Sequence, residues 1–254
     1  MPAPPPLPSD AHADLGFVCA VPMELAAFLG RCERQRSYSD RGFTFRGGIY
    51  DGVRIVAVES GAGMVKAERA ARELIAVHSP KWVLSCGFAG ALQPQLAVGD
   101  MIAVNQIVDD HAHELQIDLK MEADPARKLH VGRLATVSKI VRTVAEKQQL
   151  GARTGALAVD METFAVAKVC QELQRKFLAF RVISDDLSAD LPPEVMSIFG
   201  DTGAVRFGAV IGSLWKRPSS VTDLWKLREQ AGKAGEHLAD FLDGVVKQLY
   251  RADH

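Results

Sequence analysis

One stretch of the sequence, residues 157–186, constrains the fold more than any other. It reads LAVDMETFAVAKVC, then QELQRK, then FLAFRVISDD. Two apolar runs of strand length flank a segment whose apolar residues recur at helical spacing, so the stretch predicts a strand, a helix and a second strand. Such an order is typical of an α/β fold.

Two acidic residues lie where these strands end. Glu162 follows the first apolar run and Asp185 closes the second. In open α/β folds ligands bind at the carboxyl ends of strands, so we expect both carboxylates to face one crevice. Either acid alone is most simply a solvated charge or a helix N-cap. Two of them at successive strand ends favour a binding or catalytic site.

Composition limits the class of protein. The chain has 254 residues, of which 48% are hydrophobic and 24% charged, and no Gly/Ser/Pro linker interrupts its middle. We therefore predict one domain over residues 15–254, preceded by a Pro-rich disordered tail over residues 1–14. A net charge of −1 does not favour nucleic acid as a partner. No apolar run reaches the ~20 residues that span a bilayer.

Neither the cysteines nor the histidines predict a metal site. The four cysteines show no CxxC pair, and Cys19, Cys86 and Cys170 lie in apolar runs where cysteine behaves as a small buried hydrophobe. We expect a reduced, cytoplasmic protein. His111 and His113 form an H-x-H pair, which is common on solvated loops, so we predict no metal and no cofactor.

The chain before residue 100 contains further strand-to-helix turns. LGFVCAV predicts a buried strand that ends at Pro22, which places Glu24 in the first turn of a helix. Phe43–Tyr50 and Val53–Glu59 predict a hairpin joined through Asp51-Gly52. The next turn, SGAG, contains Gly61 and Gly63, whose backbone N–H groups could approach a ligand oxygen at a helix N-terminus.

Several of these motifs resemble one family. AVDMET followed by an apolar helix and RVISDD is similar to the signature of the purine nucleoside phosphorylase and nucleosidase superfamily, which includes methylthioadenosine/S-adenosylhomocysteine nucleosidases. AVPMEL, the Gly-x-Ala-Gly turn and the Val-Gly-Asp motif at residues 98–100 also match. The resemblance implies a three-layer α/β/α sandwich with a central mixed sheet, nucleoside phosphorylase-like, acting on a small-molecule nucleoside. We also expect a homo-oligomer, with a dimer favoured.

The resemblance assigns roles to individual residues. Asp185 would protonate the departing purine, Glu162 would bind the ribose, and Glu24 would activate the attacking water. The remaining predicted substrate-binding residues match the same motifs and are Met161, Ser184, Gly87, Phe88, Ala89 and Gly61. Phe88 departs from the family pattern, which commonly has a small hydroxyl residue at this position.

These roles fit the chemistry of N-glycosidic cleavage. The bond breaks through an oxocarbenium-like ribosyl cation, and the departing base needs a proton. To donate that proton near neutral pH, Asp185 would need a raised pKa. The roles place one carboxyl group on each side of the bond. Hydrolysis by water is favoured over phosphorolysis, because the related phosphorylases have arginines at the positions of Glu24 and Ser85. Phosphorolysis, with Arg46 or Lys66 binding phosphate, remains the alternative, and a nucleoside-binding protein without turnover is the second.

A narrower resemblance concerns the far end of the substrate. SCGFAGA and LAVDME are similar to the hopanoid-associated nucleosidases, which cleave adenine from adenosylhopane, so a lipid-linked adenosine is a candidate substrate. Residues 206–233 have a net charge of +4 and include Trp215 and Trp225, a composition that suits peripheral contact with a membrane. LSADLPPEVMSIF would then supply an apolar surface for the lipid.

Overall fold

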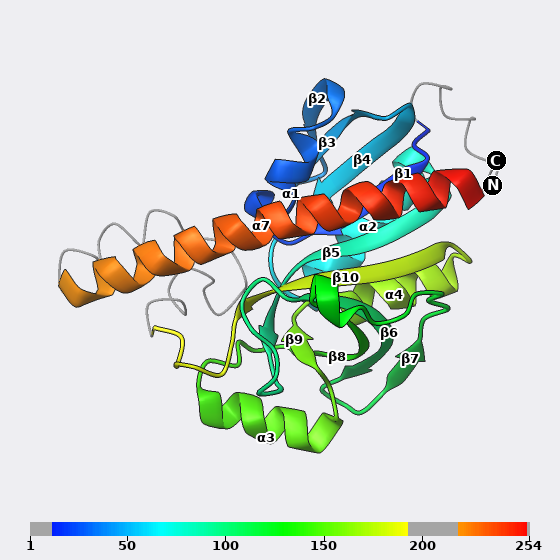
Figure 1. Ribbon diagram of the computed structural model, residues 1–254. Coiled ribbons are helices and arrows are strands. Elements are labelled where there is room, and N and C mark those ends of the chain that lie inside the picture. The colour runs from blue at the N-terminus through cyan, green and yellow to red at the C-terminus, as the bar shows by residue number, and fades with distance from the viewer. Residues whose placement is uncertain (1–11, 193–217, 253–254) are drawn as a thin grey trace.

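The computed structural model describes residues 12–192 and 218–252 (Figure 1). Within these ranges the chain forms a mixed α/β fold around one large sheet, as the sequence predicted. Residues 206–217 of the basic segment lie outside the described residues. No helix in the described ranges is both long enough and apolar enough to cross a membrane.

The sheet has two parts that share β5 (Trp82–Ala91). On one side of β5 the strands follow the order β1, β4, β3, β2, with β1 parallel to both β4 and β5. On the other side, β5, β10, β6, β8 and β9 pair in a closed ring. The bounds of the other strands are β1 Leu15–Cys19, β2 Glu33–Asp40, β3 Phe43–Tyr50, β4 Val53–Glu59, β6 Met101–Asp109, β7 Glu114–Gln116, β8 Leu129–Thr136, β9 Ala158–Asp160 and β10 Lys176–Asp185.

Helices cover both faces of this sheet. α1 (Pro22–Leu29) and α7 (Pro218–Ala252) bury apolar residues such as Phe28 and Leu238 against one face. α2 (Met64–His78) and α4 (Thr163–Glu172) pack on the other face. α3 (Val144–Thr154) lies at the end of the molecule beside β9 (Figure 1). A short 3₁₀ turn, Pro125–Arg127, precedes β8 in the chain. The layers therefore match the predicted α/β/α sandwich.

Local sequence explains where several elements begin and turn. The predicted hairpin is confirmed at the predicted bounds, and Asp51 and Gly52 both take positive φ values, as a tight two-residue turn requires. α3 begins with a capping box: the Thr143 hydroxyl accepts from the Glu146 N–H, and Glu146 accepts from the Thr143 N–H at 2.8 Å. The pattern Thr-x-x-Glu thus fixes the register of α3.

β2 was not evident from the sequence. It is exposed along its whole length and its residues, ERQRSYSD, show no alternation of apolar and polar side chains. β9, the strand predicted before α4, has only three residues. It also runs antiparallel to β5, whereas β10 runs parallel to β5. The strand before Glu162 and the strand that ends at Asp185 therefore run in opposite directions.

Candidate active site

The Glu24 carboxyl group is buried at the first turn of α1 and is held by three backbone groups. The N–H groups of Ala20 and Val21 donate to Oε2 at 2.7 and 2.9 Å, and the N–H of Phe88 donates to Oε1 at 2.9 Å. Burial raises the pKa of Glu24, and Arg181 and the three N–H groups oppose that rise. The net effect is a pKa of Glu24 above its ordinary value.

Gly87 is required where β5 passes Glu24. A Cβ atom on Gly87 would lie 2.4 Å from Glu24 Oε1, which is closer than two such atoms approach. The next residue, Phe88, supplies the N–H that binds this carboxyl group and packs its half-buried ring against the core under α1 and α7. Phe88 therefore contributes a backbone donor to Glu24, and its predicted contact with substrate stays a prediction.

Glu162 lies at the turn between β9 and α4. Its Oε1 accepts from the Gly63 N–H at 2.8 Å and its Oε2 from the Met161 N–H at 3.2 Å. Burial and the neighbouring Asp160 raise the pKa of Glu162 to about 8, while the Gly63 N–H and Arg181 oppose the rise. Glu24 raises it further, so Glu24 and Glu162 act on each other electrostatically.

The N–H group of Gly61 forms a hydrogen bond within the protein. Gly61 has a φ of +76°, and its N–H donates to the Ala20 carbonyl at 3.0 Å. The turn SGAG thus ties β4 to the strand that precedes Glu24, and it is Gly63 whose N–H binds a side-chain carboxylate. A contact of Gly61 with substrate stays a prediction.

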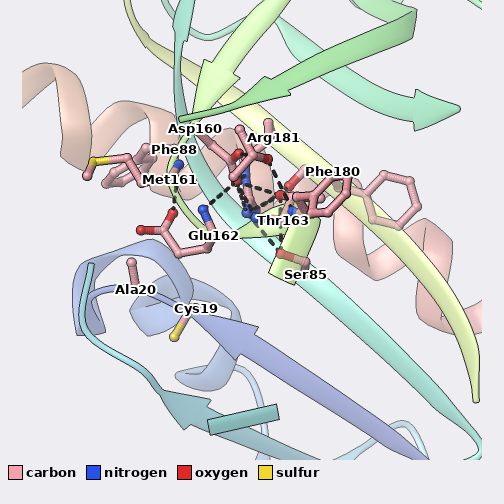
Figure 2. Close-up of polar contacts among 12 residues, drawn as sticks. Cys19, Ala20, Ser85, Phe88, Asp160, Met161, Glu162, Thr163, Phe180 and Arg181 are labelled. Carbon is pink, nitrogen blue, oxygen red and sulfur yellow. Dashed lines mark hydrogen bonds and ion pairs between the residues drawn. The ribbon is translucent and has the colours of Figure 1, made fainter. Parts of the chain in front are cut away.

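A buried arginine connects the strands beneath these two glutamates. Arg181 on β10 is 2% exposed and donates to Asp160 Oδ2 through both Nε and Nη2, at 3.1 and 2.7 Å. Nη2 also donates to the hydroxyls of Ser85 and Thr163 (Figure 2). Asp160 in turn accepts from the Thr163 N–H at 2.9 Å, so the same carboxylate caps α4. This cluster fixes the turn that carries Glu162.

Asp185 closes β10 beside the last residues of β5. Its Oδ1 accepts from the Ser184 hydroxyl at 2.7 Å, and a Cβ on Gly90 would lie 2.9 Å from its Oδ2. The Ser184 hydroxyl also lies 3.4 Å from the carbonyl oxygen of Ala89. Because Glu24 contacts β5 at Gly87 and Asp185 contacts it at Gly90, the two contacts are about 10 Å apart along the strand.

The motif Val-Gly-Asp at residues 98–100 supports the end of β10. The Gly99 N–H donates to the Ile183 carbonyl, and the Ile183 N–H donates to the Asp100 carbonyl, both at 2.9 Å. Gly99 has a φ of +91°. This reciprocal pair fixes the backbone immediately before Ser184 and Asp185, which is a structural reason for the motif to lie here.

Two charged residues of the site were missed from the sequence. Lys147 on α3 is fully buried and its Nζ donates to Asp185 Oδ2 at 2.5 Å. In the sequence it reads as an ordinary surface lysine within AEKQQ. Arg181 offered a signal, because it is the one charge inside the apolar run FLAFRVIS. A buried strand tolerates such a charge when a partner such as Asp160 neutralises it.

The cysteines and histidines stay outside this chemistry. All four cysteines are free and buried, as predicted for Cys19, Cys86 and Cys170, and burial raises the pKa of Cys86 to about 12. His113 is tied to Asp109 at 2.9 Å. Among the described residues no group of histidine, cysteine and acidic side chains is arranged to hold a metal ion.

The chain is thus an α/β protein in which three carboxyl groups, those of Glu24, Glu162 and Asp185, lie near the ends of β1, β9 and β10. Residues 14–127 and 112–211 match the model of the phosphorylase superfamily, and the chain belongs to this family. The predicted membership is thereby confirmed.

Curated relatives and solved structures agree with that assignment. The 5'-methylthioadenosine/S-adenosylhomocysteine nucleosidase of Staphylococcus haemolyticus is 26% identical over 195 residues, which cover 67% of this chain and 86% of the relative. The enzyme of the same name from Colwellia psychrerythraea is 26% identical over 227 residues, or 77% and 93% of the two chains. Futalosine hydrolase of Helicobacter pylori has the same fold, with a TM-score of 0.67, 21% identity and coverage of 94% of this chain and 100% of its own.

A mutant of the Helicobacter pylori nucleosidase with 5'-methylthioadenosine in its active site also shares the fold. Its TM-score is 0.65 at 20% identity, and the match covers 93% of this chain and 99% of that one. Both Helicobacter pylori structures are too distant in sequence to show more than the fold.

Proposed function

We propose that this protein hydrolyses the N-glycosidic bond of a 5'-substituted adenine nucleoside. In this proposal Glu24 takes a proton from the attacking water, Glu162 accepts hydrogen bonds from the ribose hydroxyls, and Asp185 protonates the departing base. The observation that carries the proposal is the buried Glu24 carboxyl group, which three backbone N–H groups hold in one orientation. Such fixed placement is what a general base requires.

The surroundings of Glu24 favour water over phosphate as the nucleophile. A phosphate dianion at this position would face two buried acids, Glu24 and Glu162, and would need arginine donors to compensate. Arg181 is committed to Asp160, and Arg46 donates to Glu59 at 2.5 Å. Phosphorolysis is therefore the second candidate, and a nucleoside-binding protein without turnover is less favoured because all three acids occupy fixed positions.

The 5' substituent is the finer part of the proposal. The curated relatives are named for methylthioadenosine and S-adenosylhomocysteine, whereas the motif resemblance suggests a lipid-linked adenosine. Leu187 and Leu191, just beyond Asp185, are partly buried and would form the beginning of an apolar surface. The other apolar residues of that segment, and residues 206–217 of the basic segment after it, lie outside the described residues. Membrane contact and a dimeric state stay predictions.

One assay with several substrates tests this function. The protein is incubated with 5'-methylthioadenosine, S-adenosylhomocysteine and a long-chain 5'-alkyl adenosine, with and without phosphate, and the free base and sugar are measured by mass spectrometry. We expect adenine and a free ribose derivative at the same rate in both buffers. A ribose 1-phosphate product would establish phosphorolysis instead, and binding without any base release would exclude an enzyme of this type.

The same assay separates the two classes of 5' substituent. If the long-chain nucleoside is the better substrate and the protein co-sediments with anionic vesicles at low salt, the lipid-linked substrate is supported. Faster cleavage of methylthioadenosine, together with no vesicle binding, would reject it and leave a nucleosidase for small 5' groups.

A further inference from the structure

Lys147 is a buried charge that neither the family motifs nor the proposed reaction has used. Its side chain is fully buried between α3 and the ends of β5 and β10. Nζ donates to Asp185 Oδ2 at 2.5 Å and to the carbonyl oxygen of Asp186 at 3.1 Å. Burial of an ammonium group costs free energy unless a partner compensates it, and here the partner is Asp185.

α3 holds the whole segment that contains Asp185. The Val144 N–H donates to Asp190 Oδ1 at 2.8 Å, and Arg142 bonds Leu191 through both its carbonyl and its Nη1 group, at 2.9 Å each. Together with the two bonds from Lys147, these contacts fix both ends of residues 185–191 against one helix. Lys147 is the member of this set that touches a carboxyl group of the candidate site.

The two oxygens of Asp185 have different neighbours. Oδ2 faces Lys147, and Oδ1 faces the Ser184 hydroxyl. The side chain of Asp185 is 18% exposed, whereas that of Lys147 is 0% exposed. Part of the Asp185 side chain is therefore accessible, whereas Lys147 is completely covered. The next acid, Asp186, has its own carboxylate bonded to the Ser188 N–H at 2.9 Å.

We propose that Lys147 is a positioning residue for the general acid: it orients Asp185 and stabilises the carboxylate that Asp185 becomes during the reaction. This inference rests on the proposed function. As the bond from C1' to the base breaks, the bonding pair leaves with the purine, and the Asp185 proton passes to a ring nitrogen. Water adds a hydroxyl group to C1' and gives its other proton to Glu24. Asp185 is left with one negative charge, which Lys147 faces.

An interaction of this kind accelerates the reaction because it is stronger in the transition state than before it. The attraction between Lys147 and Asp185 grows as the proton leaves, and water is excluded on the side of the lysine. A lysine that merely attached α3 to the sheet would stabilise the fold but would have no reason to affect one leaving group more than another. The two roles therefore predict different results.

A double-mutant cycle distinguishes these roles. The variants are Lys147→Met, Asp185→Asn and the two together, with Lys139→Met, an exposed lysine just before α3, as the matched control. With 5'-methylthioadenosine we expect Lys147→Met to lower kcat about 10- to 100-fold and to change KM less than about 3-fold, as part of the ~10²–10⁴-fold effect of a general acid. In the Asp185→Asn background, Lys147→Met should have no further effect on kcat.

A second substrate provides an independent readout. 4-Nitrophenyl β-D-ribofuranoside has a leaving group that departs without protonation, so its cleavage by the wild type and by Lys147→Met should be equal. Equal losses on both substrates, an additive loss in the Asp185→Asn background, or unchanged turnover of methylthioadenosine by Lys147→Met would each overturn the inference. If the wild type does not cleave the aryl riboside, the cycle decides alone.

Two further results keep the outcome interpretable. If Lys147→Met does not fold, Lys147→Gln, which keeps an N–H donor without the charge, replaces it in the same cycle with the same expectation. Failure of the wild type to release adenine would reject the proposed function itself. Normal release by the wild type and by Lys147→Met alike would reject only the role of Lys147.

Discussion

Glu24 shows how a single side chain acquires a catalytic environment from backbone alone. Three N–H groups from two separate elements converge on its carboxyl group, and β5 passes so closely that Gly87 has no room for a Cβ atom. Because these donors fix the carboxyl group before any substrate binds, no free energy is spent on orienting it during the reaction.

Glu24→Gln should abolish most hydrolysis while the protein folds normally. The amide keeps the size of the side chain, and its oxygen can still accept from the Ala20 and Val21 N–H groups, but it cannot take a proton from water. We expect kcat for adenine release to fall about 10²–10⁴-fold, measured with 5'-methylthioadenosine at saturating concentration. Glu33→Gln on the exposed strand β2 is the control. Turnover within a few-fold of wild type would remove Glu24 from the mechanism.

The sequence indicated the acids of the site more readily than their partners. Glu24, Glu162 and Asp185 each follow an apolar run, so their positions at the ends of strands were visible in the sequence. Lys147 was not visible, because its burial depends on how α3 lies against Asp185, which is 38 residues away in the chain. Contacts of this kind come from the tertiary fold and leave no local pattern.

The turn from β9 to α4 carries two buried acids, Asp160 and Glu162. Asp160 caps α4, accepts from the Thr136 hydroxyl at 2.7 Å and neutralises Arg181. The apolar pattern of residues 157–186 predicted this strand and helix but not the ion pair between β9 and β10. A three-residue strand does not hold its place by its own pairing, so we attribute the position of Glu162 largely to this pair.

Removing one partner of that pair should therefore be more harmful than removing both. Arg181→Met leaves Asp160 buried without its cation, and we expect a loss of about 3–5 kcal/mol in the free energy of unfolding, measured with urea. The double variant Arg181→Met with Asp160→Asn should recover part of that loss, because no isolated charge remains. Arg36→Met on β2, where the side chain is exposed, is the control. A double variant as unstable as the single one would show that the pair acts through hydrogen bonds rather than charge.

At the scale of the whole molecule, β5 brings the three acids of the site together. It lies at the junction of the parallel strands and the closed ring. The side chains of Glu24 and Asp185 lie against its glycines, and Thr163, next to Glu162, lies against its Ser85. The general α/β architecture followed from the order of strands and helices. The closed ring did not, because nothing in the sequence of β9 indicates that it pairs with β5 in the direction opposite to β10.

This arrangement makes activity and stability depend on pH in opposite directions. Burial and then Asp160 raise the pKa of Glu162 to about 8 from 4.5, and burial also raises that of Glu24. Both groups must be ionised to bind ribose hydroxyls and to accept a proton, so the acidic limb of the pH–rate profile should rise through this range. Loss of the proton that Asp185 donates should limit activity on the alkaline limb.

Stability should follow the opposite course. A carboxyl group whose pKa is higher in the folded than in the unfolded state contributes stability that is complete below pH 4.5 and is lost as pH rises toward 8. Glu162→Gln cannot ionise, so it should be more stable than the wild type at pH 8, by roughly 1–3 kcal/mol, and nearly equal to it at pH 4.5. Urea unfolding at the two pH values measures the difference, with Glu114→Gln, an exposed residue of β7, as the control. A Glu162→Gln variant that is less stable than the wild type at pH 8 would mean that the Gly63 N–H and Arg181 stabilise the ionised carboxylate by more than burial destabilises it.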